Sequence, residues 1–208
     1  DPLGQAIDYQ TDALGRIVQK RVPDPRQSDG IRTETFAYDR CGNLVVAANP
    51  DSRVELAYDA AGRVVEEKQG DDFVIAHAYD VAGNRIERRT QLNPGGEIIT
   101  HTVRCEYDAL DAVSSIQIDD AAPITFQRNA LGQICVEHLG SGLRRELSYT
   151  SEGLLATQTL LSGTGALFAS EYAYDANGEM LRKRDSRLGI EHYQYDPVGK
   201  LTGHLDPA

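Results

Sequence analysis

A short string of the form Tyr-Asp-x-x-Gly recurs along the whole chain, and its spacing constrains the fold more than any other feature. Aligning the chain on the glycine of this string gives nine units, spaced 27, 20, 21, 28, 21, 21, 25 and 21 residues apart. A recurring period of this length is the signature of a repeat architecture. The glycine slot is occupied by Gly15, Gly42, Gly62, Gly83, Asp111, Gly132, Gly153, Gly178 and Gly199.

Two columns of side chains accompany the glycine slot. Four residues before it lies the tyrosine slot, which holds Thr11, Tyr38, Tyr58, Tyr79, Tyr107, Arg128, Tyr149, Tyr174 and Tyr195. Two residues earlier stand Tyr9, Phe36, Leu56, His77, Cys105, Phe126, Leu147, Tyr172 and Tyr193. All ten tyrosines of the chain fall in these columns, which excludes a compositional accident. Side chains two residues apart on a strand point to one face, so both columns are expected on the same face of a sheet.

The string itself has the chemistry of a tight hairpin turn. In Asp59-Ala60-Ala61-Gly62 the aspartate can accept the backbone N–H two residues on, and the glycine stands where a three-residue loop needs a positive φ. The sequence therefore predicts a type I turn closed by a one-residue bulge at the glycine. Two residues after the glycine slot an apolar residue returns in every unit except that of Arg85, so a second strand is expected to face the same way as the tyrosines.

A second, more variable turn separates the hairpins. The strings "NPDS" from Asn49, "QGDD" from Gln69, "NPGG" from Asn93, "LGSG" from Leu139 and "SGTG" from Ser162 all have turn composition. Insertions concentrate there, in "PDPRQSDG" from Pro23 and "QLNPGGE" from Gln91. Each unit is therefore expected to be strand, tight turn, strand, looser turn.

A lone hairpin is barely stable in water, so the units are expected to stack side by side in one sheet. Eighteen strands at about 4.8 Å spacing give a ribbon roughly 86 Å long, and twisted sheets of this size curl. The predicted fold class is all-β with less than a tenth helix, built as a single array over residues 1–208 without an internal domain boundary. The competing architecture is a β-propeller, but nine hairpins give four and a half blades of two hairpins each, which suits a closed ring poorly.

Composition excludes several classes of protein. With 40% apolar and 25% charged residues the chain fits a folded protein rather than a disordered one, and its net charge of −11 argues against nucleic-acid or anionic-membrane partners. No apolar run approaches the roughly 18 residues of a membrane span, and no signal peptide is visible. The abrupt start at "DPLG" and stop at "LDPA" are those expected of a piece of a longer polypeptide.

Units with cores such as "YDAAGRV", "YDVAGNR" and "YDANGEM" resemble the RHS/YD repeats over the whole chain. The departures are local and comprise Thr11 and Arg128 in the tyrosine slot, Asn129 and Thr150 in the aspartate slot, and Asp111 in the glycine slot. These units are expected to have looser or altered turns, that of Asp111 most of all, because a left-handed conformation costs a non-glycine residue about 1 kcal/mol or more.

The resemblance implies a spiralling β-sheet that forms a hollow shell. Similar shells enclose a toxic domain in bacterial polymorphic toxins and insecticidal toxin complexes, and a similar shell serves adhesion in animal teneurins. The bacterial family also carries an autoproteolytic region, but the chain has no match to it, so no catalytic residue is carried over. Closed into one ring the ribbon would be about 27 Å across, less than the roughly 36 Å of a toxin domain. The chain is therefore expected to be one section of a shell wall.

Residues that could carry chemistry have structural explanations. The aspartates Asp12, Asp39, Asp59, Asp80, Asp108, Asp175 and Asp196 each have a turn to cap and no ligand-spaced neighbour. The histidines His77, His101, His138, His192 and His204 lack metal-binding spacing and are expected to be satisfied structural residues. Cys41, Cys105 and Cys135 show no C-x-x-C pattern and are expected to be plain buried or half-buried thiols.

Other patterns give the same result. The chain lacks G-x-S-x-G, P-loop and G-x-G-x-x-G motifs, and "GSG" at Gly140 and "GTG" at Gly163 have loop composition. Arg88-Arg89 and Arg182-Lys183-Arg184 alternate along strands and are expected to form solvated faces or cross-strand charge pairs. The tyrosine columns either pack as partly buried ladders, which the apolar residue after each glycine favours, or form an exposed stripe that binds sugar or protein.

The sequence therefore predicts a non-enzymatic structural module, part of a β-shell that encloses a toxin or effector in a larger protein. That protein is expected to be made in the bacterial cytoplasm and then secreted or delivered. The partners are the rest of the shell and its cargo, with no membrane insertion by this segment. An adhesin-like module that binds carbohydrate or a surface protein is the alternative, and an enzyme is the third hypothesis. No catalytic, cofactor-binding or metal-binding residue is assigned, and no cofactor is expected.

Overall fold

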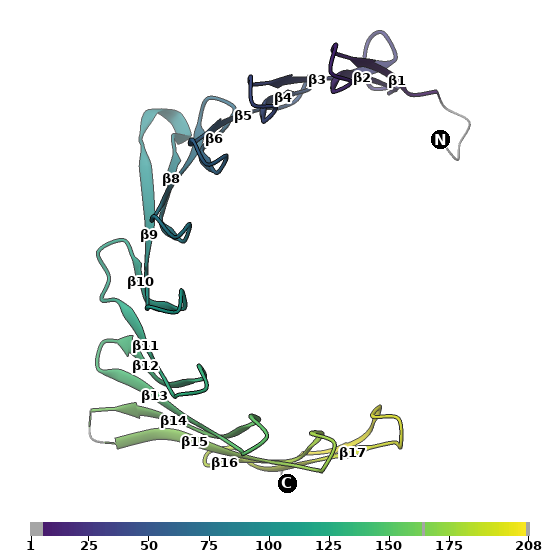
Figure 1. Ribbon diagram of the computed structural model, residues 1–208. Helices are drawn as coiled ribbons and strands as arrows, with labels where there is room; N and C mark the ends of the chain where they lie inside the picture. The colour runs from purple at the N-terminus through teal and green to yellow at the C-terminus, as the bar shows by residue number, and fades with distance from the viewer. Residues whose placement is uncertain (1–5, 164, 207–208) are drawn as a thin grey trace. The chain divides into compact units, whose positions relative to one another are not determined.

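The computed structural model describes residues 6–163 and 165–206, and its secondary structure is almost entirely β-strand (Figure 1). Within these residues the one helical element is a single 3₁₀ turn, η1 (Pro94–Gly96), in one of the predicted looser turns. The predicted all-β fold with less than a tenth helix is confirmed. The described part of the chain has no helix with the length and apolar character needed to span a bilayer.

The chain divides into two compact units, residues 1–104 and 105–208, which are described separately. The first unit is a meander of antiparallel strands in which each strand pairs with the next along the chain. Its strands are β1 (Asp8–Thr11), β2 (Ile17–Pro23), β3 (Ile31–Tyr38), β4 (Leu44–Ala48), β5 (Arg53–Tyr58), β6 (Val64–Gln69), β7 (Phe73–Tyr79), β8 (Arg85–Leu92) and most of β9 (Ile99–Tyr107).

The second unit repeats this arrangement, beginning with the last three residues of β9. Its remaining strands also pair in chain order and antiparallel. They are β10 (Val113–Ile118), β11 (Ile124–Arg128), β12 (Ile134–Gly140), β13 (Leu143–Tyr149), β14 (Leu155–Ser162), β15 (Gly165–Tyr174), β16 (Met180–Asp185), β17 (Gly189–Tyr195) and β18 (Leu201–Leu205).

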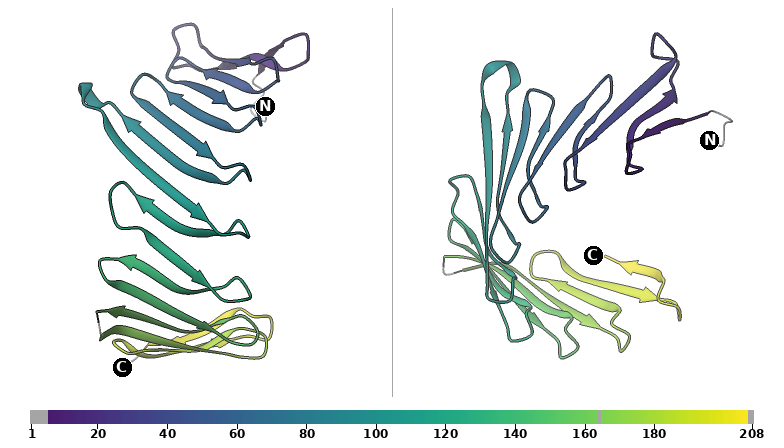
Figure 2. Two further views of the ribbon diagram at one scale, coloured as in Figure 1. Left: turned by 60° about the vertical axis from the view of Figure 1, so that its left-hand side comes forward. Right: turned by 45° about the horizontal axis from the view of Figure 1, so that its top comes forward.

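The ladder of hydrogen bonds continues through the looser turns as well as the tight ones. In the first unit β2 pairs with β3, β4 with β5 and β6 with β7, so successive hairpins belong to one sheet. A β-propeller would interrupt the ladder after every fourth strand. The propeller alternative is therefore excluded, and Figures 1 and 2 show a ribbon of hairpins that curls within each unit, as predicted. The single array over residues 1–208 without internal boundary stays a prediction.

One face of the sheet, which we call the tyrosine face, carries the tyrosine slot. Across the tight turn Tyr58 pairs with Val64, and Tyr149 pairs with Leu155 in the same way. The apolar residue after the glycine therefore lies on the tyrosine face, as predicted. Strand β13 shows the difference between the faces, because its residues alternate between half-buried positions on the tyrosine face and exposed positions on the other.

The sheet is a single layer, and no second layer covers either face of the described residues. The accessible surface is 13895 Å², whereas a compact monomer of 22.8 kDa exposes about 9,600 Å². Ile75 is the one apolar side chain of the described residues that is buried, at 9% exposure. Stability must therefore come mainly from strand pairing and from contacts between neighbouring hairpins rather than from a packed core.

Candidate functional site

The tight turn is the first structural element of the repeat, and the turn of Asp59 represents it. Gly62 adopts a φ of +77°, and its N–H donates to the Asp59 carbonyl at 3.0 Å. The Asp59 N–H donates to the Arg63 carbonyl at 2.9 Å, which closes the loop. Asp59 Oδ1 accepts the N–H groups of Ala61 and Arg63 at 2.9 and 3.0 Å. The predicted type I turn with a glycine bulge and a capping aspartate is confirmed.

Several of the capping aspartates have a pKa that is lowered by hydrogen bonds within their own turns. The Arg16 side chain, bonded to Asp12, lowers the pKa of that carboxyl, and the Asn43 side chain does the same for Asp39. For Asp59 the backbone N–H of Arg63 is the largest cause of the lowered pKa. A depressed carboxyl pKa means that this contribution to stability is present above the ordinary aspartate pKa and is lost on strong acidification. The predicted capping role of these aspartates is therefore confirmed.

The prediction of altered turns at the departures is largely wrong. Asp111 takes a φ of +59° in the glycine slot, and its N–H still donates to the Asp108 carbonyl at 3.0 Å. Asn129 accepts the same two backbone N–H groups as an aspartate does, at 3.0 and 3.1 Å. Thr150 alone caps more loosely, through one bond of 3.3 Å from Leu154. Neighbouring hairpins fix the loop length, so a poor residue adopts the turn conformation and the unit loses stability instead.

The second structural element is a hydrogen bond that joins a hairpin to the preceding one in several units, which we call the tyrosine staple. The Tyr58 hydroxyl in β5 donates to the carbonyl of Leu44, the first residue of β4. The β4–β5 ladder stops at Val46 and Glu55, so the hydroxyl supplies a donor where the backbone provides none. The staples join Tyr38 to Ile17 (2.9 Å), Tyr58 to Leu44 (2.8 Å), Tyr79 to Val64 (3.0 Å), Tyr149 to Ile134 (2.8 Å) and Tyr174 to Leu155 (2.9 Å).

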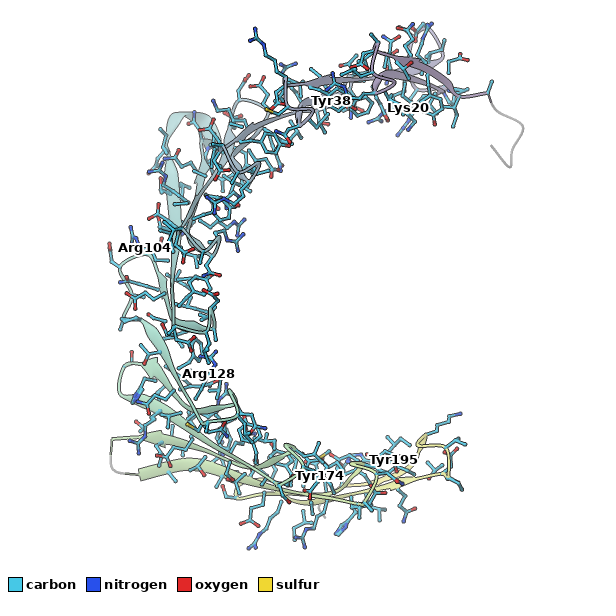
Figure 3. All side chains as sticks on the ribbon, viewed as in Figure 1. Lys20, Tyr38, Arg104, Arg128, Tyr174 and Tyr195 are labelled. Carbon is cyan, nitrogen blue, oxygen red and sulfur yellow. The ribbon has the colours of Figure 1, made fainter. Side chains whose placement is uncertain are left out.

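Arg128 forms an equivalent staple, although it departs from the sequence pattern. Its Nη1 donates to the Val113 carbonyl at 2.7 Å, and its guanidinium lies 6.0 Å from the centre of the Phe126 ring. Val113 is the first residue of β10, the position that a tyrosine hydroxyl reaches elsewhere. Figure 3 labels Arg128 together with three tyrosines of the same slot, Tyr38, Tyr174 and Tyr195. The unit therefore keeps the staple with a charged donor.

A third contact links neighbouring tight turns through the residue after the glycine. The Arg63 guanidinium lies 4.6 Å from the centre of the Tyr79 ring and donates to the Asp80 carbonyl of the next turn at 3.2 Å. Arg16 lies at the same distance over Tyr38. These contacts cover the rings of the tyrosine face, and of the ten tyrosines only Tyr9 is exposed, at 53%. The tyrosines are half-buried ladders, as the first of the two hypotheses predicted, rather than an exposed stripe.

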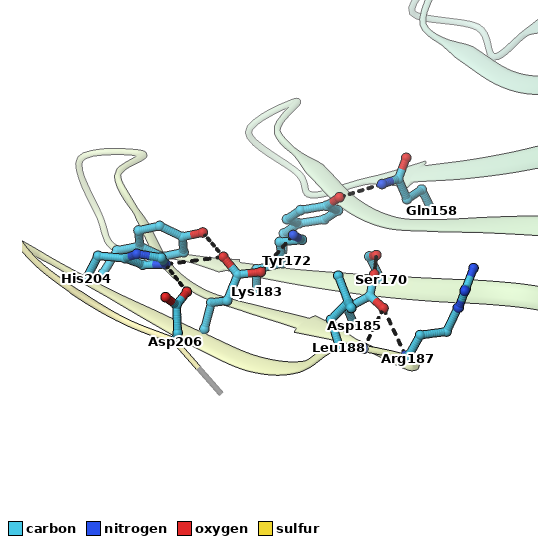
Figure 4. A network of polar contacts seen from close by, with 11 residues as sticks. Gln158, Ser170, Tyr172, Lys183, Asp185, Arg187, Leu188, His204 and Asp206 are labelled. Carbon is cyan, nitrogen blue, oxygen red and sulfur yellow. Dashed lines mark hydrogen bonds and ion pairs between the residues drawn. The ribbon is translucent and has the colours of Figure 1, made fainter. Parts of the chain in front are cut away.

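A polar ladder crosses strands β14 to β18 on the tyrosine face (Figure 4). Lys183 Nζ in β16 donates to Glu191 Oε1 in β17 at 2.8 Å, and the Tyr193 hydroxyl donates to Glu191 Oε2 at 2.5 Å. These two donors are the main causes that lower the pKa of Glu191 to about 2, and the hydrogen bonds to the Glu191 carboxylate in turn raise the pKa of Lys183 and of Tyr193. Nearby, Gln158 donates to the Tyr172 hydroxyl at 2.6 Å, and Ser170, only 1% exposed, donates to Asp185 at 2.8 Å.

The predicted histidines remain on separate strands, and one of them differs from expectation. Burial, followed by the charges of Arg85 and Arg88, lowers the pKa of His77. Its Nδ1 is buried and has no hydrogen-bond partner, so the prediction that this histidine is satisfied is wrong. The basic clusters alternate between the two faces of the sheet, as predicted. Arg88 pairs with His77 across the strands and Arg89 pairs with Ala76, so these two arginines lie on opposite faces. Lys183 faces Glu191, whereas Arg184 pairs with Ile190.

One group of side chains has donor atoms close enough to hold a cation, namely Glu191, His204 and Asp206, within 4.8 Å of one another. Both oxygens of Glu191 already accept a hydrogen bond, from Lys183 and from Tyr193. We therefore assign no metal to it. The cysteines are free, and Cys105 and Cys135 are half-buried as predicted. The prediction is wrong for Cys41, which is exposed because it lies in a tight turn. The absence of catalytic, cofactor-binding and metal-binding residues stays a prediction.

The turn, the staple and the continuous ladder define a β-hairpin repeat protein with the YD signature. No family model matches the chain. It is 27% identical over 206 residues to the probable deoxyribonuclease RhsA of Dickeya dadantii, covering 95% of this chain and 14% of that protein. It is 23% identical to the double-stranded DNA deaminase toxin A of Burkholderia cenocepacia (89% and 15% covered) and 24% identical to the toxin protein Tse5 of Pseudomonas aeruginosa (91% and 14% covered).

Solved structures show the same fold. The TcdB2-TccC3 structure without its hypervariable C-terminal region matches with a TM-score of 0.58 at 17% identity, over 95% of this chain and 13% of that one. The Tc holotoxin pore of Photorhabdus luminescens matches with a TM-score of 0.57 at 16% identity, over 96% and 13%. The resemblance to RHS/YD-repeat toxins is confirmed. The chain spans only 13–15% of these relatives and structures.

Proposed function

We propose that the chain is a non-enzymatic section of an RHS-type shell wall, which encloses and protects a toxin or effector domain in a longer bacterial polypeptide. The tyrosine staple supports this proposal most directly, since it ties successive hairpins together at several places in both units and needs no second layer. A sheet built in this way can extend by adding hairpins and can separate two compartments. The chain is one section of the wall, and its partners are the remaining repeats and the enclosed domain.

The similarity to two bacterial proteins named as toxins supports the enclosed partner and a secreted or delivered location. In this proposal the chemistry belongs to the enclosed domain, and the wall contributes only containment. The adhesin-like alternative requires exposed aromatic side chains for sugar stacking. The half-buried tyrosines do not favour it.

The proposal is tested by limited proteolysis of the full polypeptide that contains this segment. Replacing Tyr58, Tyr79 and Tyr149 by phenylalanine together removes three staples and is expected to raise the cleavage rate of the enclosed domain about tenfold or more. Tyr9→Phe is the matched control, since Tyr9 is exposed and is expected to leave the rate unchanged. An effector domain cleaved equally fast in the unchanged polypeptide and in the free state would contradict containment.

A further inference from the structure

His204 occupies the end of the polar ladder on β18, the last described strand. Its register partner is Tyr193 on β17, and the two rings stack with centroids 4.8 Å apart at 21°. His204 Nε2 lies 3.3 Å from Glu191 Oε2 and 3.4 Å from Asp206 Oδ1 (Figure 4). The ring is thus fixed by stacking while one nitrogen faces two carboxylates.

The charges around His204 alternate in sign from strand to strand on this face. Strand β16 contributes Lys183, β17 contributes Glu191 and Tyr193, and β18 itself leads into Asp206. His192, the other histidine of this hairpin, pairs with Arg182 and Leu205 and is exposed, whereas its neighbours Glu191 and Tyr193 are half-buried on the tyrosine face. Of the groups in this ladder, histidine alone changes charge near neutral pH.

We propose that His204 is a proton-operated latch, which holds the β17–β18 hairpin more tightly when the imidazole is protonated. Protonation turns two long polar contacts into ion pairs with Glu191 and Asp206, and it completes an alternating row of charges across β16, β17 and β18. Both carboxylates face the same nitrogen, so protonation does not add a donor there; it ensures that Nε2 carries its hydrogen and gives the ring a positive charge, whereas the neutral ring offers at most one uncharged N–H.

The direction of the pH effect follows from the groups involved. A positive charge that is stabilised only in the folded hairpin adds to the stability of the hairpin at acid pH, where an imidazole is protonated. This added stability is lost as the pH rises and the imidazole loses its proton. Glu191 remains ionised throughout, because its pKa is lowered to about 2. The latch is therefore expected to act on the acid side of neutrality, where an imidazole is protonated and Glu191 is still ionised. The latch acts within the β17–β18 hairpin and does not depend on whether the wall encloses a cargo.

Amide hydrogen exchange of the full chain at two pH values, corrected for intrinsic exchange, tests the latch. From about pH 7.5 to about pH 5.5 the protection of the paired β17 and β18 amides is expected to rise about 2- to 10-fold relative to those of β13 and β14. His204→Gln is expected to abolish this rise, and Glu191→Gln is expected to reduce it. His192→Gln, on the exposed face of the same hairpin, is the control and is expected to keep it.

The readout is a pH dependence, so a variant that is merely less stable still gives an interpretable result. An unchanged protection in the parent chain, or the same rise in His204→Gln as in the parent, would overturn the latch. Loss of the rise in His192→Gln would also overturn it, since the effect would then be a general response of the hairpin.

Discussion

At the scale of single residues, the repeat depends on three small pieces of chemistry. The capping aspartate satisfies the turn, the glycine accepts its positive φ, and the slot tyrosine donates a hydrogen bond where the ladder between hairpins has ended. The first two act within five consecutive residues and could be predicted from the sequence. The staple could not, because its acceptor lies in the preceding unit, at a carbonyl left open only by the place where strand pairing stops.

Variants at Arg128 can distinguish the contribution of the staple hydrogen bond from that of the tyrosine ring. Arg128→Leu leaves the Val113 carbonyl without its donor and is expected to lower the free energy of unfolding by about 1–3 kcal/mol. Arg128→Tyr restores the usual donor and is expected to stay within about 0.5 kcal/mol of the parent chain. Urea unfolding of both variants measures the difference. Equal losses in the two variants would show that the guanidinium contributes by something other than the staple.

At the scale of the elements, a hairpin is specified by its tight turn, and the turn tolerates poor residues. The sequence indicated where each turn lies because the Asp-x-x-Gly signal is local and the strand period of two sets the register. It misjudged Asp111, which keeps the backbone bonds of the Asp59 turn at a φ of +59°. The signal reports the preference of an isolated turn, whereas the neighbouring strands decide the conformation in the sheet.

The strain stored at Asp111 can be measured by exchanging residues between adjacent units. Asp111→Gly is expected to raise the free energy of unfolding by about 0.5–1 kcal/mol, because glycine adopts the left-handed region without the clash. The converse change, Gly132→Asp, is expected to lower it by a similar amount, since a Cβ there meets nothing within 4 Å and only the backbone is strained. Thermal or urea unfolding reports both. A loss of stability in Asp111→Gly would contradict the strain argument.

At the scale of the whole molecule, the chain is stabilised by contacts between consecutive hairpins rather than by a shared core. Its pairings run in chain order within each unit, and each staple joins a hairpin to the one directly before it. The repeat period predicted this arrangement. The charge pair of Lys183 with Glu191 is one of the two arrangements predicted for this basic cluster. Its extension to His204 was not foreseen, because it depends on the registers across β16, β17 and β18. Where contacts involve nearest neighbours only, stability is expected to be a sum of local terms.

Pairs of staple mutations test this additivity. Tyr58→Phe and Tyr149→Phe remove staples in different units, and their unfolding free energies are expected to add within about 0.5 kcal/mol. Tyr58→Phe and Tyr79→Phe act on adjacent hairpins, since Tyr79 reaches Val64, the register partner of Tyr58. That pair is expected to deviate from additivity by about 0.5 kcal/mol or more. Double-mutant cycles in urea measure both, and additivity in the adjacent pair would mean that each staple stabilises its own hairpin alone.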